Sequence, residues 1–240
     1  MNKMGLTLIY LWLVSLCSCQ QELIEYEKGD VKVCIEQGEQ WLHDFPLFLG
    51  INKKNPPQIA VWLEDTQGNY LSTVYVTHKI ATQSWQASGG NRRKEALPHW
   101  CYSRGVKYDD GLYLPTKKEP LIDGISGATP HESFDIKLNP ATALKKFVVK
   151  IEINHSTDFN EAFPKSAKEG EANYSGGKEG SGQPAIVYAA NVDLSSGEKS
   201  FEANLMGHSS PDGSSGEVNK NTSGLTTALH IVKRITVIIQ

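Results

Sequence analysis

The chain has 240 residues, of which 39% are hydrophobic and 21% are charged, so it can bury a sizeable core. Its formal net charge is −3, and it lacks the basic stripe that a nucleic-acid-binding surface needs, which excludes nucleic acid as a partner. The 21 glycines favour a loop-rich, all-β protein.

Residues 1–18 have the organisation of a bacterial lipoprotein signal peptide. Lys3 supplies a positive charge, and residues 5–16 form a largely apolar core that is shorter than the ~20 residues of a membrane-spanning helix. Leu16, two small residues and Cys19 then follow in the order of a lipobox. We therefore predict cleavage before Cys19, lipidation of its thiol and a membrane-anchored, extracytoplasmic protein. The alternative is an ordinary secretory signal with two incidental cysteines.

The mature chain is predicted to contain a short leader and one domain. Residues 19–30 form the polar, lipid-anchored leader, and residues 31–240 form a single β domain, because no internal repeat or low-complexity linker divides them. Gln20 provides no obvious retention signal for the inner membrane, which favours the outer membrane.

Alternation of apolar and polar residues and enrichment in β-branched and aromatic residues predict a series of strands. They cover residues 31–35, 58–65, 70–80, 134–138, 147–154, 184–192, 201–206 and 229–239. A turn containing Gly68 predicts a hairpin between the second and third strands. No segment keeps a helical period over three turns. The expected fold class is therefore all-β, an antiparallel β-sandwich of immunoglobulin or fibronectin-III type with long loops.

Two long connections, residues 81–124 and 156–183, interrupt these strands, and connections of this length are usually functional or mobile. A short helix is expected at residues 92–97, ending before Pro98. The first connection also carries aromatic and basic residues that suit either a contact surface or packing beneath a loop, and packing is favoured because tryptophan is usually buried. These residues are Trp85, Arg92, Arg93, Trp100, Tyr102 and Arg104.

The sequence DGISGAT at residues 123–129 resembles the recognition motif for covalent flavinylation, in which FMN is attached to the final threonine through a phosphoester. The hydroxyl of Thr129 can attack the pyrophosphate of FAD. Gly127 lets a phosphate approach the backbone closely, and Ser126 can donate a hydrogen bond to it. Asp123, Ser126, Gly127 and Thr129 are therefore the candidate cofactor-binding residues.

The same segment has a simpler interpretation as a tight turn. Gly124 and Gly127 would then supply positive φ angles, and Asp123 and Ser126 would cap backbone amides. This interpretation requires no cofactor, and the Pro130 that follows departs from the Ser or Thr usual at flavinylated sites.

A metal site is a weaker candidate. His155, Asp158 and Glu161 cluster after a predicted strand, and His208 follows a later one, so they could provide ligands to a calcium-like ion if His155 and His208 converge. The spacing lacks the glycine and the D-x-D pattern of an EF-hand, and a hydrogen-bonded polar loop explains the same residues.

Two cysteines, Cys34 and Cys101, remain after the lipidated one. In an oxidising compartment they form either a disulfide or two separate buried thiols, and the sequence leaves both alternatives open. Elsewhere the chain has no Gly-x-Ser-x-Gly elbow, no Cys-x-x-Cys and no phosphate-binding loop with a lysine, so nothing supports a hydrolase or a nucleotide-hydrolysing enzyme.

Several segments together resemble the domain of unknown function 2271 family of predicted periplasmic proteins. The segments are 59–65 with the Gly68 turn, 97–100, 123–130, 148–160 and 182–190. The resemblance implies an extracytoplasmic β-sandwich and an association with membrane redox proteins and flavin transferases. It brings no established reaction.

Two functions follow as expectations. The first is a non-catalytic binding or assembly lipoprotein, because sandwiches commonly bind ligands and no catalytic constellation is evident. The alternative is an accessory electron carrier with FMN covalently attached at Thr129, partnered by a flavin transferase or a membrane redox protein.

Overall fold

The computed structural model describes six stretches of the chain: residues 22–25, 30–46, 52–85, 92–121, 125–140 and 144–240. The predicted signal peptide, Cys19 and Asp123 lie outside these described residues.

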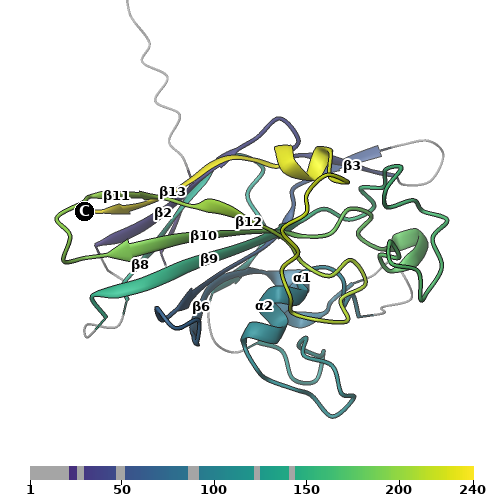
Figure 1. The fold of residues 1–240 in the computed structure, drawn as a ribbon, viewed down its shortest axis with the longest axis horizontal. Coiled ribbons are helices and arrows are strands. Elements are labelled where there is room, and N and C mark those ends of the chain that lie inside the picture. The colour runs from purple at the N-terminus through teal and green to yellow at the C-terminus, as the bar shows by residue number, and fades with distance from the viewer. Residues whose placement is uncertain (1–21, 26–29, 47–51, 86–91, 122–124, 141–143) are drawn as a thin grey trace, which may run out of the picture.

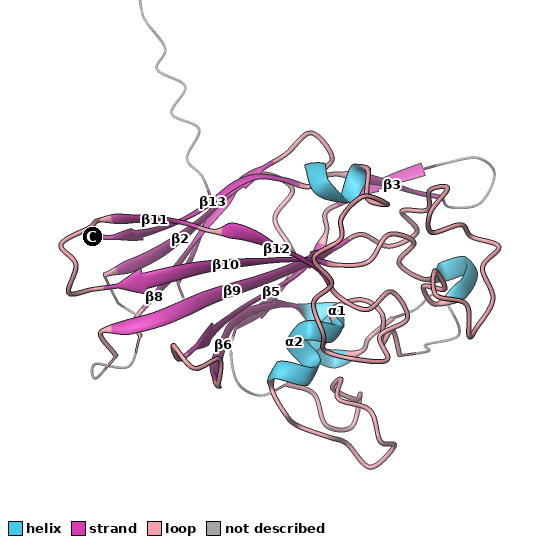
Figure 2. Cartoon of the chain, viewed as in Figure 1, coloured by secondary structure: helices cyan, strands magenta, loops and turns pink. Residues whose placement is uncertain are grey.

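Two β-sheets pack face to face and form a sandwich (Figures 1 and 2). The five-stranded sheet has the order β1 (Glu22–Glu25), β8 (Phe134–Leu138), β2 (Val31–Gln37), β13 (Val232–Ile239) and β11 (Ser200–Glu202). The six-stranded sheet has the order β12 (Asn204–His208), β10 (Ile186–Asp193), β9 (Lys146–Asn154), β5 (Gln58–Glu64), β6 (Tyr70–Thr77) and β7 (Ile125–Gly127). Within these two sheets the pairs are antiparallel, except for β1 with β8 and β6 with β7. The prediction of an all-β sandwich with long loops is confirmed.

The smaller elements lie in the connections. They are the hairpin of β3 (His43–Pro46) and β4 (Asn52–Asn55), the helices α1 (His78–Thr82) and α2 (Pro98–Ser103), and the 3₁₀ turns Gly177–Glu179 and Thr227–His230.

The core between the sheets follows from strand alternation. In β2, Val33 and Ile35 point inward and are fully buried, while Cys34 between them is half-buried. In β9, Val149 and Ile151 face them from the other sheet. Each fully buried aliphatic side chain stabilises the fold by about 1.5–3 kcal/mol.

The six-stranded sheet is buried on its outer face as well. Trp62 and Val76 point away from the inter-sheet core and are fully buried against Leu97 and Trp100 of the connection that follows α1. Figure 2 shows α1 and α2 on this side of the sheet. The interpretation of Trp85 and Trp100 as packing residues is therefore confirmed, since both are buried in this cluster.

The expected helix at 92–97 is wrong. The helix in this region is α2, which begins at Pro98 instead of ending before it. Proline is favourable in the first turn of a helix, because the N–H that it lacks would have no intrahelical partner there. A buried carboxylate fixes the start of α2: Glu152 in β9 accepts hydrogen bonds from the backbone N–H groups of His99 at 3.1 Å and Trp100 at 2.7 Å.

Some strands were not predicted. Part of the expected leader forms β1, and the loop before residue 58 contains β3 and β4. The strand expected at 201–206 divides into β11 and β12, which belong to different sheets. These strands have three to five residues each, so their local sequence carries little strand signal. β1, β11 and β12 each pair with a longer strand, whereas β3 and β4 pair with each other.

Replacing Phe134 with alanine should lower the free energy of unfolding by about 3–5 kcal/mol. The ring is fully buried, with its centroid 6.1 Å from that of Trp41 and 5.8 Å from that of Tyr75. Leu205 is 42% exposed, so the control Leu205→Ala should change the free energy of unfolding by no more than about 0.5 kcal/mol. Urea unfolding followed by tryptophan fluorescence measures both, and equal losses in the two variants would contradict the packing described.

Candidate functional site

A cleft of about 990 Å³ lies beside the end of the six-stranded sheet. Its walls come from the β3–β4 hairpin, the start of β5, the junction of β6 with α1, the segment after β7 and the residues that follow β9. Its volume is at the upper end of the range for small-molecule and cofactor sites.

The DGISGAT motif leads into this cleft. Ile125, Ser126 and Gly127 form β7, an edge strand that pairs in parallel with the last residues of β6, so that Thr77 lies opposite Gly127. Gly127, Ala128 and Thr129 then line the cleft. Three of the four candidate cofactor residues are described, and all three are at or next to the cleft; Asp123 lies outside the described residues.

Gly127 does not serve a tight turn. It lies in an extended strand and is not among the glycines with positive φ. A Cβ added to it would meet only the Tyr75 ring at 3.7 Å and the Tyr75 hydroxyl at 3.9 Å, which are ordinary contacts. The turn interpretation is therefore wrong for Gly127, and the fold itself gives no reason for glycine at this position.

Thr129 is held at the base of the cleft and is 4% exposed. Its hydroxyl oxygen is 2.8 Å from that of Thr77, at the end of β6. The next residue is anchored too, because Trp41 donates a hydrogen bond from Nε1 to the carbonyl oxygen of Pro130 at 3.1 Å. Thr129 is thus tied to β6, and the residue after it is tied to the loop between β2 and β3.

Cations and an aromatic ring form one wall of the cleft. Lys79 and Arg93 both lie over the Trp85 ring, at 5.6 Å and 4.9 Å from its centroid. Arg93 is buried and fully engaged, with Glu95 as its ion-pair partner. Lys79 and Lys53 are exposed, and both line the cleft.

Two histidines lie together at another wall of the cleft. The ring centroids of His43 and His155 are 5.1 Å apart, and Nε2 of His155 is 2.8 Å from the carbonyl oxygen of Gln40. This contact makes Nε2 the protonated nitrogen of the neutral ring. Burial lowers the pKa of His155 to about 4, against the opposing effect of the hydrogen bond to Gln40. His155 is therefore neutral at physiological pH.

The metal-site candidates do not converge. Asp158 accepts a hydrogen bond from the Thr227 hydroxyl at 2.6 Å, Glu161 is exposed, and Nδ1 of His208 contacts the carbonyl oxygen of Ser209 at 2.8 Å. Among the residues that the structure describes, no group of three or more His, Cys, Asp or Glu side chains could hold a metal ion. The alternative of a hydrogen-bonded polar loop explains Asp158, and His208 belongs to the packing around Phe163.

The two cysteines are free thiols, so the disulfide alternative is wrong and the alternative of separate thiols is right. Cys34 lies in β2 on the outer face of the five-stranded sheet, whereas Cys101 lies in α2, buried on the outer face of the other sheet. The sandwich separates them, which no feature of the sequence reveals.

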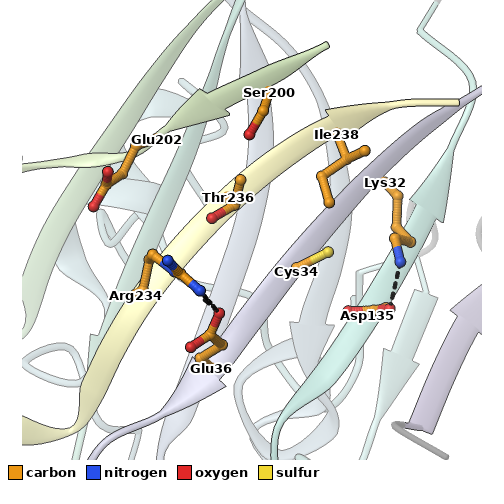
Figure 3. Close-up of a pocket in the computed structure, with 9 residues that line it drawn as sticks. All are labelled: Lys32, Cys34, Glu36, Asp135, Ser200, Glu202, Arg234, Thr236 and Ile238. Carbon is orange, nitrogen blue, oxygen red and sulfur yellow. Dashed lines mark hydrogen bonds and ion pairs between the residues drawn. The ribbon is translucent and has the colours of Figure 1, made fainter.

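A second hollow, of about 390 Å³, surrounds Cys34 (Figure 3). Ion pairs of Lys32 with Asp135 and of Arg234 with Glu36 cross its floor. Burial raises the pKa of the Cys34 thiol to about 12, with the nearby Asp135 as a further cause, so little of the reactive thiolate forms near neutral pH. The charges here pair with one another across strands, as on the solvent face of a sheet.

Several cleft residues were missed at the sequence level. Lys53 and His43 belong to the unpredicted hairpin. Thr77, His78 and Lys79 lie near the end of the predicted strand 70–80, but the strand ends at Thr77, and His78 and Lys79 begin α1. The one local signal was the basic and polar character of residues 77–79 at the end of an apolar strand.

Comparison of the chain with sequence profiles of known families, with curated proteins and with solved structures gave no match. The resemblance to the domain of unknown function 2271 family and the immunoglobulin or fibronectin-III likeness therefore stay predictions. Among the described residues, no helix is long and apolar enough to cross a membrane.

Both cysteines should react with iodoacetamide in the unfolded chain without added reductant. In the folded chain at pH 8 both should react slowly, because burial raises the pKa of each thiol and leaves little thiolate. Peptide mass spectrometry of the alkylated chain measures the labelling at each site. A Cys34–Cys101 peptide pair that separates only after reduction would contradict the assignment.

The stability of the protein should fall as the pH drops from about 6.5 to about 4, through His155. The folded state holds this ring neutral, whereas the unfolded chain binds a proton there below about pH 6.5, so acid favours unfolding. His155→Gln retains a donor for Gln40 and does not titrate. Urea titrations across this pH range measure the free energy of unfolding of both proteins. As the pH falls, the wild type should lose stability relative to the variant. A difference between the two that stays constant would refute the assignment.

Proposed function

We propose that the protein is a membrane-anchored, extracytoplasmic lipoprotein that carries FMN covalently on Thr129 and acts as an accessory electron carrier. In this proposal Cys19 bears the lipid, most simply in the outer membrane. The partners are a flavin transferase, which loads the cofactor, and a membrane redox protein, in keeping with the resemblance to the domain of unknown function 2271 family.

The observation that carries the proposal is the position of the motif. Thr129 lines a cleft of about 990 Å³, directly after an edge strand in which Gly127 has no structural reason to be glycine. A glycine in an extended edge strand suits close approach by another backbone or by a phosphate. A flavinylation motif needs both features: space for the flavin beside the threonine, and a glycine that lets the phosphate come close to the backbone.

The side chains that line the cleft fit FMN. FMN combines a phosphate with a planar aromatic ring, and the cleft combines the exposed cations Lys53 and Lys79 with apolar side chains such as Phe45 and Pro57. Lys53 and Lys79 would hold the phosphate by charge, and Ser126 offers a hydroxyl beside it. FMN, when bound, would supply one- and two-electron transfer, which these side chains lack.

Attachment balances without a redox change. The Thr129 oxygen forms a bond to the phosphorus of the FMN half of FAD, and the bond from that phosphorus to the bridging oxygen of the pyrophosphate breaks. AMP leaves, and the hydroxyl proton of Thr129 is released to solvent. The protein gains one FMN less one water.

One observation favours a second candidate, a non-catalytic binding or assembly module. The side chain of Thr129 is buried and already hydrogen-bonded to Thr77. The same cleft would then hold an anionic aromatic ligand without a covalent bond, by the charges of Lys53 and Lys79.

The full chain, co-expressed with a flavin transferase and extracted from membranes in detergent, should gain the mass of one FMN less one water. Thr129→Ala should abolish the gain, because it removes the attacking oxygen. Thr116→Ala, outside the cleft, is the matched control and should be loaded as fully as wild type. Intact mass and in-gel flavin fluorescence measure loading.

No gain in the wild type, with the transferase shown to be active on a known substrate, would refute the covalent carrier. Titration of the unmodified chain with free FMN, followed by fluorescence quenching, then tests the second candidate. Retained binding that Lys79→Ala weakens would support it.

A further inference from the structure

The Thr77 hydroxyl contacts both Thr129 and the backbone of Ile59. Its oxygen accepts a hydrogen bond from the backbone N–H of Ile59, the second residue of β5, at 2.9 Å. The same oxygen is 3.4 Å from the Ile59 carbonyl oxygen and 2.8 Å from the hydroxyl oxygen of Thr129. Thr77 is buried, at the last position of β6.

The contact with Thr77 fixes the position of the Thr129 hydroxyl. The N–H of Ile59 occupies one acceptor position of the Thr77 oxygen. The distance of 2.8 Å between the two threonine oxygens is the usual O–H···O distance, and either hydroxyl can donate in this bond. The Thr129 oxygen is therefore held relative to β6 whichever hydroxyl donates.

We propose that Thr77 is a positioning residue for the attachment of FMN to Thr129, an inference that rests on the proposed function. As the Thr129 oxygen bonds to the FMN phosphorus of FAD and AMP leaves, it gives up its own proton and can then only accept hydrogen bonds. Thr77 can donate to the ester oxygen from its present place, and before the attack the same contact fixes the position of the reacting oxygen. The N–H of Ile59 holds the Thr77 oxygen in turn.

The placement of Thr77 depends on rigid elements. It is the residue of β6 that pairs with Gly127 of the motif, and Ile59 is fully buried near the start of β5. A hydroxyl held by strand pairing keeps the reacting oxygen in one position, and correct positioning of a reacting group lowers the barrier to its reaction.

Thr73 provides a matched control. It lies in the same strand, is fully buried, and its hydroxyl contacts Tyr70 Oη at 2.7 Å and Trp100 Nε1 at 3.0 Å. Thr73→Val therefore removes a buried hydroxyl from β6, as Thr77→Val does, but leaves Thr129 untouched.

The test is the kinetics of loading on the full chain. The chain is made in a host without flavin transferase, extracted in detergent, and incubated with purified transferase and FAD, and the initial rate of mass gain is measured. Thr77→Val should lower the maximal rate about tenfold, the effect of one hydrogen bond. The chain concentration at half-maximal rate should stay unchanged, because buried Thr77 is not a surface that the transferase binds. Thr77→Ser should restore the rate to within about twofold of wild type, and Thr73→Val should keep it.

The outcomes separate the two proposals. A wild-type chain that is not loaded by an active transferase would refute the proposed function. If the wild type is loaded, two results would overturn the role of Thr77 and leave the proposed function intact. One is that Thr77→Val is loaded as fast as Thr73→Val, or faster. The other is that Thr77→Ser is loaded as slowly as Thr77→Val. Should Thr77→Val fail to fold, Thr77→Ala replaces it, with the same expected rate and the same overturning result.

Discussion

Burial of the six-stranded sheet on both faces is the constraint on which the rest of the structure depends. In β5 every residue from Ile59 to Glu64 is buried, with Val61 facing the inter-sheet core and Trp62 facing outward. The second sheet covers one face, and the other needs a cover of its own, because a large exposed apolar patch is unfavourable in water. The connection after α1 provides it.

This cover is attached by a buried carboxylate. Glu152 accepts the two N–H groups at the start of α2, and burial raises its pKa to about 7, although the two hydrogen bonds oppose the shift. A carboxylate without partners in this place would cost several kcal/mol, at an order of magnitude. With α2 fixed, the chain returns along the free edge of β6, where β7 forms and the motif enters the cleft.

The charges of the cleft divide into structural and available ones. Arg93 is buried and satisfied by Glu95, Ser156 and Ser181, so it contributes to the wall of the cleft and to the stability of the loops around it. Lys79 lies over the same Trp85 ring but is exposed. Of these two cations, Lys79 is the one exposed to an anion that enters the cleft.

The sequence by itself determined the sandwich class, because alternation along strands such as 134–138 and 147–154 is set by local side-chain order. It also identified Thr129 as the candidate attachment site through residue types at fixed spacing. Only the tertiary structure decided that Gly127 is extended, that Cys34 and Cys101 are apart, and that Thr77 meets Thr129. The reason is physical: these features depend on strand pairing between residues about fifty or more positions apart, and local propensity contains no information about which strands become neighbours.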